Sequence, residues 1–196
     1  MKRSICLLAV SALFLLALAG CATAPGSAEG KSQIQDESTS VIANAQTNDP
    51  TLTKVLHDAH GYAVFPSIGK GAVGIGGAYG RGVLYENGTP IGYCDMTQAS
   101  IGLQLGGQSY AEIIAFTTTE ALNNFKTGYF AFDAQATAVA LKSGAGANAK
   151  YSNGVAVFTM NEAGLMYEAS VGGQKFTFKP LATDTASAPG AEKPKD

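Results

Sequence analysis

The chain has 196 residues, of which 46% are hydrophobic, so it is long enough for one domain with a sizeable core. Its 13 basic and 15 acidic residues give a formal net charge of −2. The basic residues are dispersed, whereas binding to a phosphate backbone needs clustered Lys and Arg, and this argues against nucleic acid as a partner.

The first 20 residues have the pattern of a lipoprotein signal peptide. Lys2 and Arg3 form a basic start, residues 5–18 form an apolar core, and Leu-Ala-Gly-Cys at 18–21 is typical of a bacterial lipobox. The apolar stretch is shorter than the ~20 residues of a membrane span. We therefore expect acylation of Cys21. Because Ala22 rather than an aspartate follows, we expect anchoring at the outer membrane of a Gram-negative cell envelope.

We divide the chain into the signal peptide (1–20), the lipidated cysteine with a linker (21–31), one domain (32–181) and a flexible tail (182–196). Loss of Lys2 and Arg3 leaves 11 basic against 15 acidic residues, so any site for anionic lipid must be local. Cys94 is the one cysteine left beside Cys21. It has no disulfide partner, and we expect a small buried side chain in a strand.

Two helices are expected before the sheet. Residues 32–46 have a weak helical pattern in which Ile34, Val41, Ile42 and Ala45 share a face. Asp49-Pro50 is a stronger helix start, with Asp49 as cap and Pro50 in the first helical position. The apolar stripe that follows ends at Gly61, and its members are Leu52, Val55, Leu56 and Ala59.

Residues 61–85 are predicted to be one long strand with glycines spaced by twos. One face carries Ala or Gly at 72, 74, 76, 78, 80 and 82. The other carries larger side chains: Val73, Ile75, Tyr79, Arg81, Val83 and Tyr85. Glycine weakens a strand, so a face this small suits a place where a backbone, an aromatic ring or a ligand comes close.

Asn87-Gly88 predicts a tight hairpin, and strands are expected at 90–96, 99–109 and 111–116. Thr117 and Glu120 have capping-box spacing for a helix over 117–126. The alanine-rich segment 134–141 fits a strand or a helix, and we favour a strand. Strands at 155–160, 164–171 and 175–178, with a turn at 161–164, complete the sheet. The expected class is α+β, mainly β: an antiparallel curved sheet or barrel with two or three flanking helices.

Several blocks of this chain resemble the signature of the SYLF domain family. They are Phe65-Pro66, Lys70-Gly71 and GGAYGRGVL at 76–84, followed by GLQLGGQ at 102–108 and by Gly164-Leu165 through 170–173. Together they cover residues 49–179. The family is a lipid- and actin-binding module of eukaryotic actin-patch and phosphoinositide-binding proteins and of bacterial lipoproteins.

The resemblance implies a non-catalytic domain that binds anionic phospholipid or phosphoinositide-like head groups. Lys70 and Arg81 match the basic motif positions, and loop N–H groups around Gly69 and Gly71 would complete an anion site. The structural alternative is that Lys70 is a solvated turn residue and that Arg81 pairs with an acid such as Glu112 or Glu86. Residues 32–46 lack the basic amphipathic character of a phosphoinositide-inserting helix.

Two other binding roles stay open. The domain can be a structural or protein-interaction module of the envelope, since some family members bind actin. Alternatively, small-faced strands that close into a barrel can leave an apolar cavity for an acyl chain, unless Phe65, Phe130, Phe132 and Phe158 fill it.

Other chemistry is poorly supported by the sequence. GKGAVG at 69–74 has GxGxxG spacing, but more glycine follows instead of the helix that dinucleotide binding needs. His57 and His60 are the only histidines, and no further metal ligand can be named beside them. No GxSxG or HExxH motif occurs. We therefore expect no enzyme activity, no metal and no cofactor.

Overall fold

A computed structural model describes residues 25–128, 131–132, 138–140, 144–147, 149 and 151–181. The signal peptide, Cys21 and the tail, all predicted above, lie outside the described residues. Three helices are described: α2 (Ala28–Asn48), α3 (Thr51–Asp58) and α4 (Thr119–Lys126). No described helix is both long and apolar enough to cross a membrane.

Three long strands build the sheet: β1 (Gly61–Glu86), β2 (Thr89–Phe116) and β5 (Val155–Pro180). They lie in the order β1-β2-β5 with antiparallel pairing, and β3 (Ala131–Phe132) continues the sheet beyond β5. The short β4 (Ala138–Ala140) pairs with β5 in parallel. A mainly-β, curved antiparallel sheet with three helices confirms the predicted fold class.

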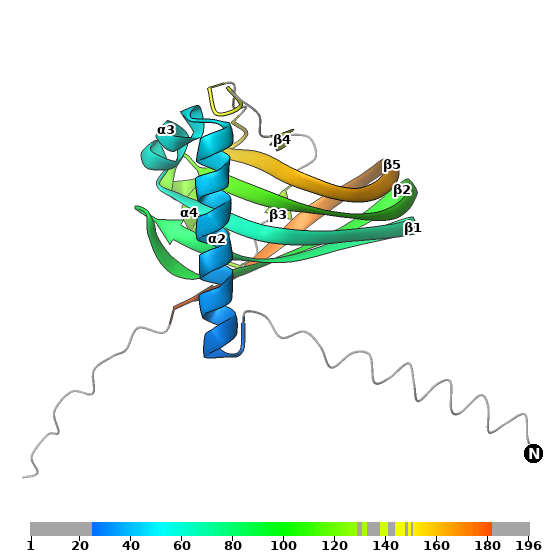
Figure 1. Ribbon diagram of the computed structural model, residues 1–196, viewed down its shortest axis with the longest axis horizontal. Coiled ribbons are helices and arrows are strands. Elements are labelled where there is room, and N and C mark those ends of the chain that lie inside the picture. Colours follow the sequence, from blue (N-terminus) through cyan, green and yellow to red (C-terminus); the bar gives the residue numbers. More distant parts are fainter. Residues whose placement is uncertain are drawn as a thin grey trace, which may run out of the picture.

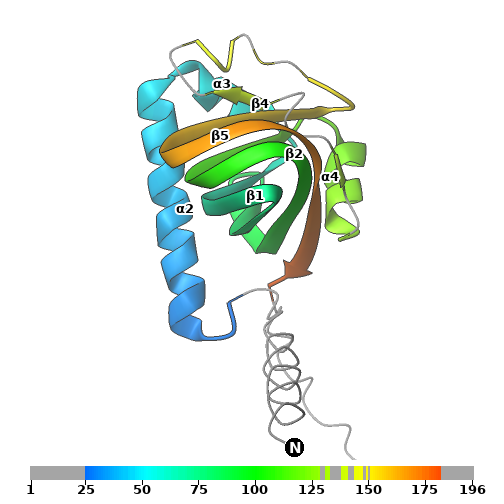
Figure 2. The same ribbon diagram turned by 90° about the vertical axis from the view of Figure 1, so that its right-hand side faces the viewer.

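Each long strand runs out from the helices, bends near its middle and returns, so the sheet folds over on itself (Figures 1 and 2). We call the two parts the first half (β1 before residue 73, β2 after 104, β5 before 167) and the second half. The bends lie together and form an arm that projects away from the helices (Figure 1). The two halves enclose an interior between them.

Buried apolar side chains form two cores on opposite faces of the sheet. The inner core lies between the halves and contains Phe65, whose ring centroid lies 5.6 Å from that of Phe176. It is closed by α4, where Phe125 contacts Phe176 at 5.4 Å. The outer core lies under α2 and α3, on the other face, and includes Phe158. Phe65 and Phe158 thus fill different cores, while Phe130 and the side chain of Phe132 lie outside the described residues.

The helix α2 is longer than predicted. It begins at Ala28, because Ser27 caps it by accepting a hydrogen bond from the Gly30 N–H at 3.1 Å, so the end of the predicted linker 21–31 is helical. Its predicted apolar face is confirmed: Ile34, Val41 and Ala45 are buried and Ile42 is partly buried.

The start of α3 is set by Asp49, as predicted. Asp49 Oδ1 accepts the backbone N–H of Thr51 at 3.0 Å. Pro50, however, precedes the helix instead of opening it, and the helix ends at Asp58 instead of Gly61, which already belongs to β1. The predicted apolar stripe is confirmed, since Leu52, Leu56 and Ala59 are buried.

The hairpin between β1 and β2 is confirmed, with positive φ at Asn87 (51°) and Gly88 (75°). The three strands predicted over 90–116 are one strand, β2, because the irregularity between Ser109 and Ala111 is a register shift and not a break. The turn predicted at 161–164 is wrong. Ala163 and Gly164 pair with Ser109 and Gln108, so β5 is continuous there.

The last helix also starts differently from the prediction. Thr118, not Thr117, is the cap of α4, and its hydroxyl accepts the Ala121 N–H at 3.1 Å. Thr117 instead donates from Oγ1 to the Gly154 carbonyl at 3.1 Å. The strand favoured over 134–141 is confirmed at 138–140, and the remainder of that segment lies outside the described residues.

The predicted close approach of backbones occurs at two glycines of β1. A Cβ at Gly82 would lie 2.5 Å from the Val64 carbonyl oxygen, and one at Gly80 would lie 2.5 Å from Ile68 Cγ1. These contacts join the returning half of β1 to its outgoing half. Glycine is needed here because the strand doubles back on itself.

Candidate functional site

One face of β1 is exposed along the arm, and its side chains change from aliphatic at the end of the arm to aromatic and then cationic. Val73 is 82% exposed, Ile75 74% and Tyr79 46%, and Arg81 is exposed as well. The alternate residues Ala72, Gly76, Ala78 and Gly80 are buried. The predicted alternation of a small face and a large face is therefore confirmed. The large face points to solvent over residues 73–81, whereas its last two members, Val83 and Tyr85, are buried in the outer core.

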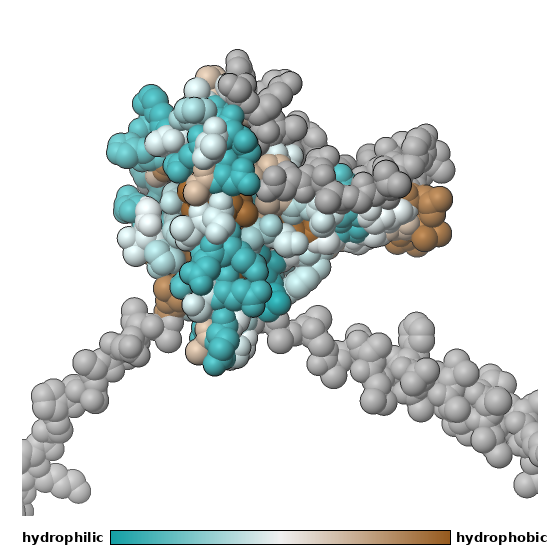
Figure 3. All heavy atoms as spheres, in the orientation of Figure 1, coloured by the Kyte–Doolittle hydropathy of each residue, from teal (hydrophilic) through white to brown (hydrophobic). Residues whose placement is uncertain are grey.

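The end of the arm is apolar. Val73 pairs in register with Leu105 of β2, which is 62% exposed, so aliphatic side chains from two strands lie together there. Figure 3 shows this hydrophobic group at the end of the arm, far from the polar surface over the helices. We call Val73, Ile75 and Leu105 the arm tip. Exposed aliphatic side chains that gather in one place mark a contact surface more strongly than scattered ones.

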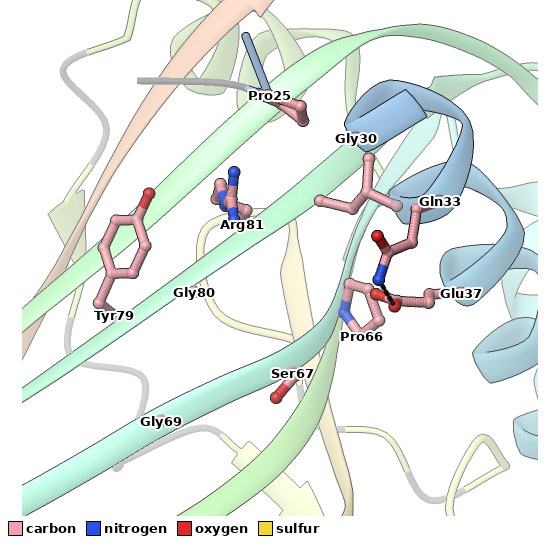
Figure 4. A pocket seen from close by; sticks show the side chains of 11 residues that line it. Pro25, Gly30, Gln33, Glu37, Pro66, Ser67, Gly69, Tyr79, Gly80 and Arg81 are labelled. Atoms are coloured by element: carbon pink, nitrogen blue, oxygen red, sulfur yellow. Dashed lines mark hydrogen bonds between the residues drawn. The ribbon is translucent and has the colours of Figure 1, made fainter. Parts of the chain in front are cut away.

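A pocket of about 340 Å³ lies between β1 and the start of α2. Figure 4 shows Tyr79 and Arg81 rising from β1 toward the pocket, with Gln33 and Glu37 of α2 across from them. Gln33 Nε2 donates to Glu37 Oε1 at 2.8 Å. The complete lining is Pro25, Gly30, Gln33, Ile34, Glu37, Pro66, Ser67, Gly69, Tyr79, Gly80 and Arg81.

Two of the four predicted head-group residues line this pocket, namely Gly69 and Arg81. Lys70 and Gly71 are not among its lining residues. All of Gly69, Lys70 and Gly71 lie within β1, paired with Ser109, Gln108 and Gly107, so the loop that the sequence predicted for them is a strand. A Cβ at Gly69 would meet nothing within 4 Å, which leaves its surface open to a ligand.

The acids named as alternative partners of Arg81 have other partners. Glu86 Oε2 accepts from Lys126 Nζ at 2.6 Å, and Glu112 lies in the interior of the folded sheet. Among the described residues, Arg81 itself forms no ion pair or hydrogen bond. Beside it, the hydroxyl of Tyr79 donates to Asp95 Oδ1 at 2.9 Å. The guanidinium is thus available to an anion at the pocket.

The arm tip was not singled out from the sequence as a site. The alternation of residues 72–82 gave the face on which Val73 and Ile75 lie, but a strand pattern does not say which face is covered. The larger side chains would usually be the buried ones. Here the small face is buried instead, because the sheet doubles back and leaves little room between its halves.

The remaining candidates carry no site in the structure. His57 Nδ1 lies 3.1 Å from Asp58 Oδ1 on the exposed side of α3, and no cluster of three metal-ligating side chains occurs among the described residues. Cys94 is buried in the inner core, as expected, and burial together with the nearby Asp95 raises the pKa of its thiol well above the usual value. That thiol is therefore neutral and unreactive.

Comparisons with known proteins find the family that the sequence blocks resemble. Residues 97–185 match the Ysc84 family, described as Las17-binding protein actin regulator. The chain is also 30% identical over 141 residues to "Beta cell expansion factor A" of Aeromonas veronii, an alignment that covers 71% of this chain and 54% of the relative. The chain thus spans about half the length of the curated relative it matches. Over residues 97–185, which begin within β2 and run past the end of β5, it is similar to the Ysc84, or SYLF, domain family.

Proposed function

We propose that this protein is an envelope lipoprotein, held by acylated Cys21 at the outer membrane of a Gram-negative cell, whose domain binds anionic membrane lipids without catalysis. In this proposal the acyl chains supply the permanent anchor. The folded domain then makes a second contact with a lipid surface through the exposed face of β1.

The observation that carries the proposal is the order of side chains on that face. Aliphatic Val73 and Ile75 stand at the end of the arm, Tyr79 follows, and Arg81 comes last. Transfer of aliphatic side chains from water to the acyl chains is favourable by roughly 25 cal/mol of free energy per Å² of apolar surface buried. Tyrosine prefers the membrane interface, and the guanidinium of arginine can bind a phosphate group through two parallel hydrogen bonds. A bilayer has the same order from its centre to its surface: apolar acyl chains, then the interface, then the anionic head groups, which attract cations.

A local site is required because the mature chain carries more acid than base. Arg81 is the one predicted cation that lines the pocket beside β1, and Gly69 leaves the backbone open there. Lys70 lies on the other face of β1, with Ile68, and is half-buried with contacts of its own, so we assign it no direct ligand role. Glu37 on the far wall favours a head group that also bears a cation or a hydroxyl.

A protein partner is the second candidate, because the matched family is described by its binding to Las17. In that case the arm tip would dock on a protein instead of entering a bilayer. Both candidates use the same exposed surface, and lipid vesicles separate them.

The test is co-sedimentation of the full chain carrying Cys21→Ser, which removes the acylation site, with vesicles of increasing anionic lipid content. We expect binding that rises with anionic lipid, falls with salt, and is weakened in the Lys70→Ala/Arg81→Ala variant. The control, Lys54→Ala, removes an exposed lysine of α3 that does not line the pocket and should bind like the parent. Absence of binding at every anionic content would leave the protein-interaction role as the better account.

A further inference from the structure

Four polar side chains are buried inside the folded sheet, among mostly apolar neighbours. Glu112 is 1% exposed, Ser100 1%, Gln174 3% and Gln98 6%. Glu112 belongs to the first half of the sheet, paired with Phe65 and Thr159. Gln174 belongs to the second half, where it pairs with Gln98. The side chains of Glu112 and Gln174 therefore meet across the interior, from opposite halves.

One hydrogen bond joins the two halves at this point, and two acceptors beside it have no donor. Gln174 Nε2 donates to Glu112 Oε2 at 3.1 Å. The other carboxyl oxygen, Glu112 Oε1, and the other amide atom of Gln174, Oε1, are both buried without a hydrogen-bond partner, and so is one donor, Nε2 of the neighbouring Gln98. A carboxylate and an amide oxygen can only accept, so as long as Glu112 is ionised neither of these two oxygens can satisfy the other. Burying such groups without a partner is costly.

No cation among the described residues compensates a charge on Glu112. On β1, Lys70 shares this face with Ile68, but it lies in register with Gln108, four positions along β2 from Glu112, and the side chains of β1 and α4 in the inner core itself are apolar. From β2, the titratable groups on this face are Cys94, a neutral thiol, and Tyr110, a phenol. From β5, the described neighbours are Thr159, which pairs with Glu112, valines, phenylalanines and Gln174 itself, none of which carries a positive charge. An ionised carboxylate here would be buried without a cationic partner among the described residues, which is costly.

We propose that Glu112 is protonated in the folded protein and that its Oε1–H donates to Gln174 Oε1, which closes a cyclic acid–amide pair that clamps the two halves of the sheet together. A single proton then satisfies both orphaned oxygens at once. Each partner donates one hydrogen bond and accepts one, and the pair carries no net charge. The clamp is independent of the lipid contact proposed above.

The titration expected of this group agrees with the geometry. Burial raises the pKa of Glu112 from 4.5 to about 7, and the hydrogen bond from Gln174 offsets only part of that rise. Between these two values the folded state binds a proton that the unfolded state has lost. The contribution of Glu112 to the free energy of unfolding is therefore greatest below pH 4.5 and falls as the pH rises from 4.5 to about 7. Above about pH 7 it levels off, because the clamp has lost its O–H.

The test compares the full chain with its Glu112→Gln variant by urea unfolding across pH 4.5 to 8. The amide of the variant supplies an N–H in place of the O–H, so it keeps both hydrogen bonds and cannot ionise. We expect the two proteins to be similar at the acid end. Toward neutral pH the folding equilibrium constant of the parent should fall relative to the variant by up to about tenfold per pH unit. A Gln98→Leu control should keep the pH dependence of the parent.

A second measurement covers the case in which the variant does not fold. The side-chain carboxyl carbon of Glu112, followed by NMR in the unsubstituted chain, should report a protonated acid at pH 6 and an ionised one above pH 8. An ionised carboxylate at pH 6 would overturn the proposal, since water or a rearranged amide would then have to satisfy the cluster. A parent-to-variant difference that stays constant across this pH range would overturn it as well.

Discussion

The carboxylate of Asp49 accepts a hydrogen bond from the backbone N–H of Gly146 at 2.6 Å, across 97 positions of the chain. The same side chain accepts from the Gly144 N–H at 3.1 Å and from Thr51 Oγ1 at 2.7 Å. Asp49 is fully buried between α2 and α3. It therefore fixes the turn at 144–147 to the junction of these two helices, in addition to capping α3.

Replacement of Asp49 by alanine should lower the free energy of unfolding by about 1–3 kcal/mol, because buried N–H groups lose their acceptor. Urea unfolding measures the change. The control is Asp58→Ala, which removes a half-exposed carboxylate at the other end of α3 and should leave stability nearly unchanged. Equal losses in the two variants would mean that the turn at 144–147 does not depend on Asp49.

The stabilisation by Asp49 should also depend on pH at the acid end. Burial raises the pKa of Asp49, but the hydrogen bonds from Thr51, Gly146 and Gly144 outweigh it and hold that pKa below 3.8. The contribution is then complete above the unfolded value and is lost as the pH falls through the lower, folded value. Urea midpoints of the parent and of Asp49→Ala should therefore converge below pH 4. A gap that stays constant to pH 2 would contradict this assignment.

Local patterns in the sequence predicted which segments are helical and which are extended, but not all of their bounds. Asp49 before Thr51 and Asn87-Gly88 between two strands each fix a few backbone angles, so the start of α3 and the hairpin were predictable. The alternation along residues 72–82 likewise gave the two faces of β1. These features depend only on neighbours in the chain, which a sequence displays directly.

The folding-over of the sheet was not predictable in the same way. The turn predicted at 161–164 is part of β5, because pairing of Ala163 and Gly164 with β2 outweighs the local turn tendency of these residues. The candidate site shows the same limit. Only the doubled-back geometry decides that Ala72 is covered and Val73 exposed, and that Glu112 faces Gln174.

Alanine substitution should distinguish the glycines that the fold requires from those that it does not. At Gly82 a Cβ would lie 2.5 Å from the backbone oxygen of Val64, which no side-chain rotation can relieve. We expect Gly82→Ala to cost about 1–3 kcal/mol, as overpacking does. The control, Gly69→Ala, has open space at its Cβ and should leave stability unchanged or slightly higher. Thermal unfolding of both variants checks the difference, and a stable Gly82→Ala protein would show that the two halves of β1 can separate.

The arm tip should contribute to vesicle binding without contributing to stability. Val73 and Ile75 are 82% and 74% exposed, so Val73→Ser/Ile75→Ser removes almost no packing in the free protein. If these side chains enter the acyl region, each should contribute up to about 1–2 kcal/mol, and the double variant should bind anionic vesicles at least tenfold more weakly. Unlike the loss in Lys70→Ala/Arg81→Ala, this loss should persist at high salt, because burial of apolar surface is not screened.

The matched control for the arm tip is Tyr151→Ser. It removes a 50% exposed hydrophobic side chain from the segment just before β5, away from the exposed face of β1. Its vesicle binding should equal that of the parent in the same Cys21→Ser background. Unchanged binding by Val73→Ser/Ile75→Ser would place the lipid contact at the Arg81 pocket alone. The apolar end of the arm would then be free for a protein partner, which is the outcome that most clearly separates a lipid-inserting arm from a protein-docking one.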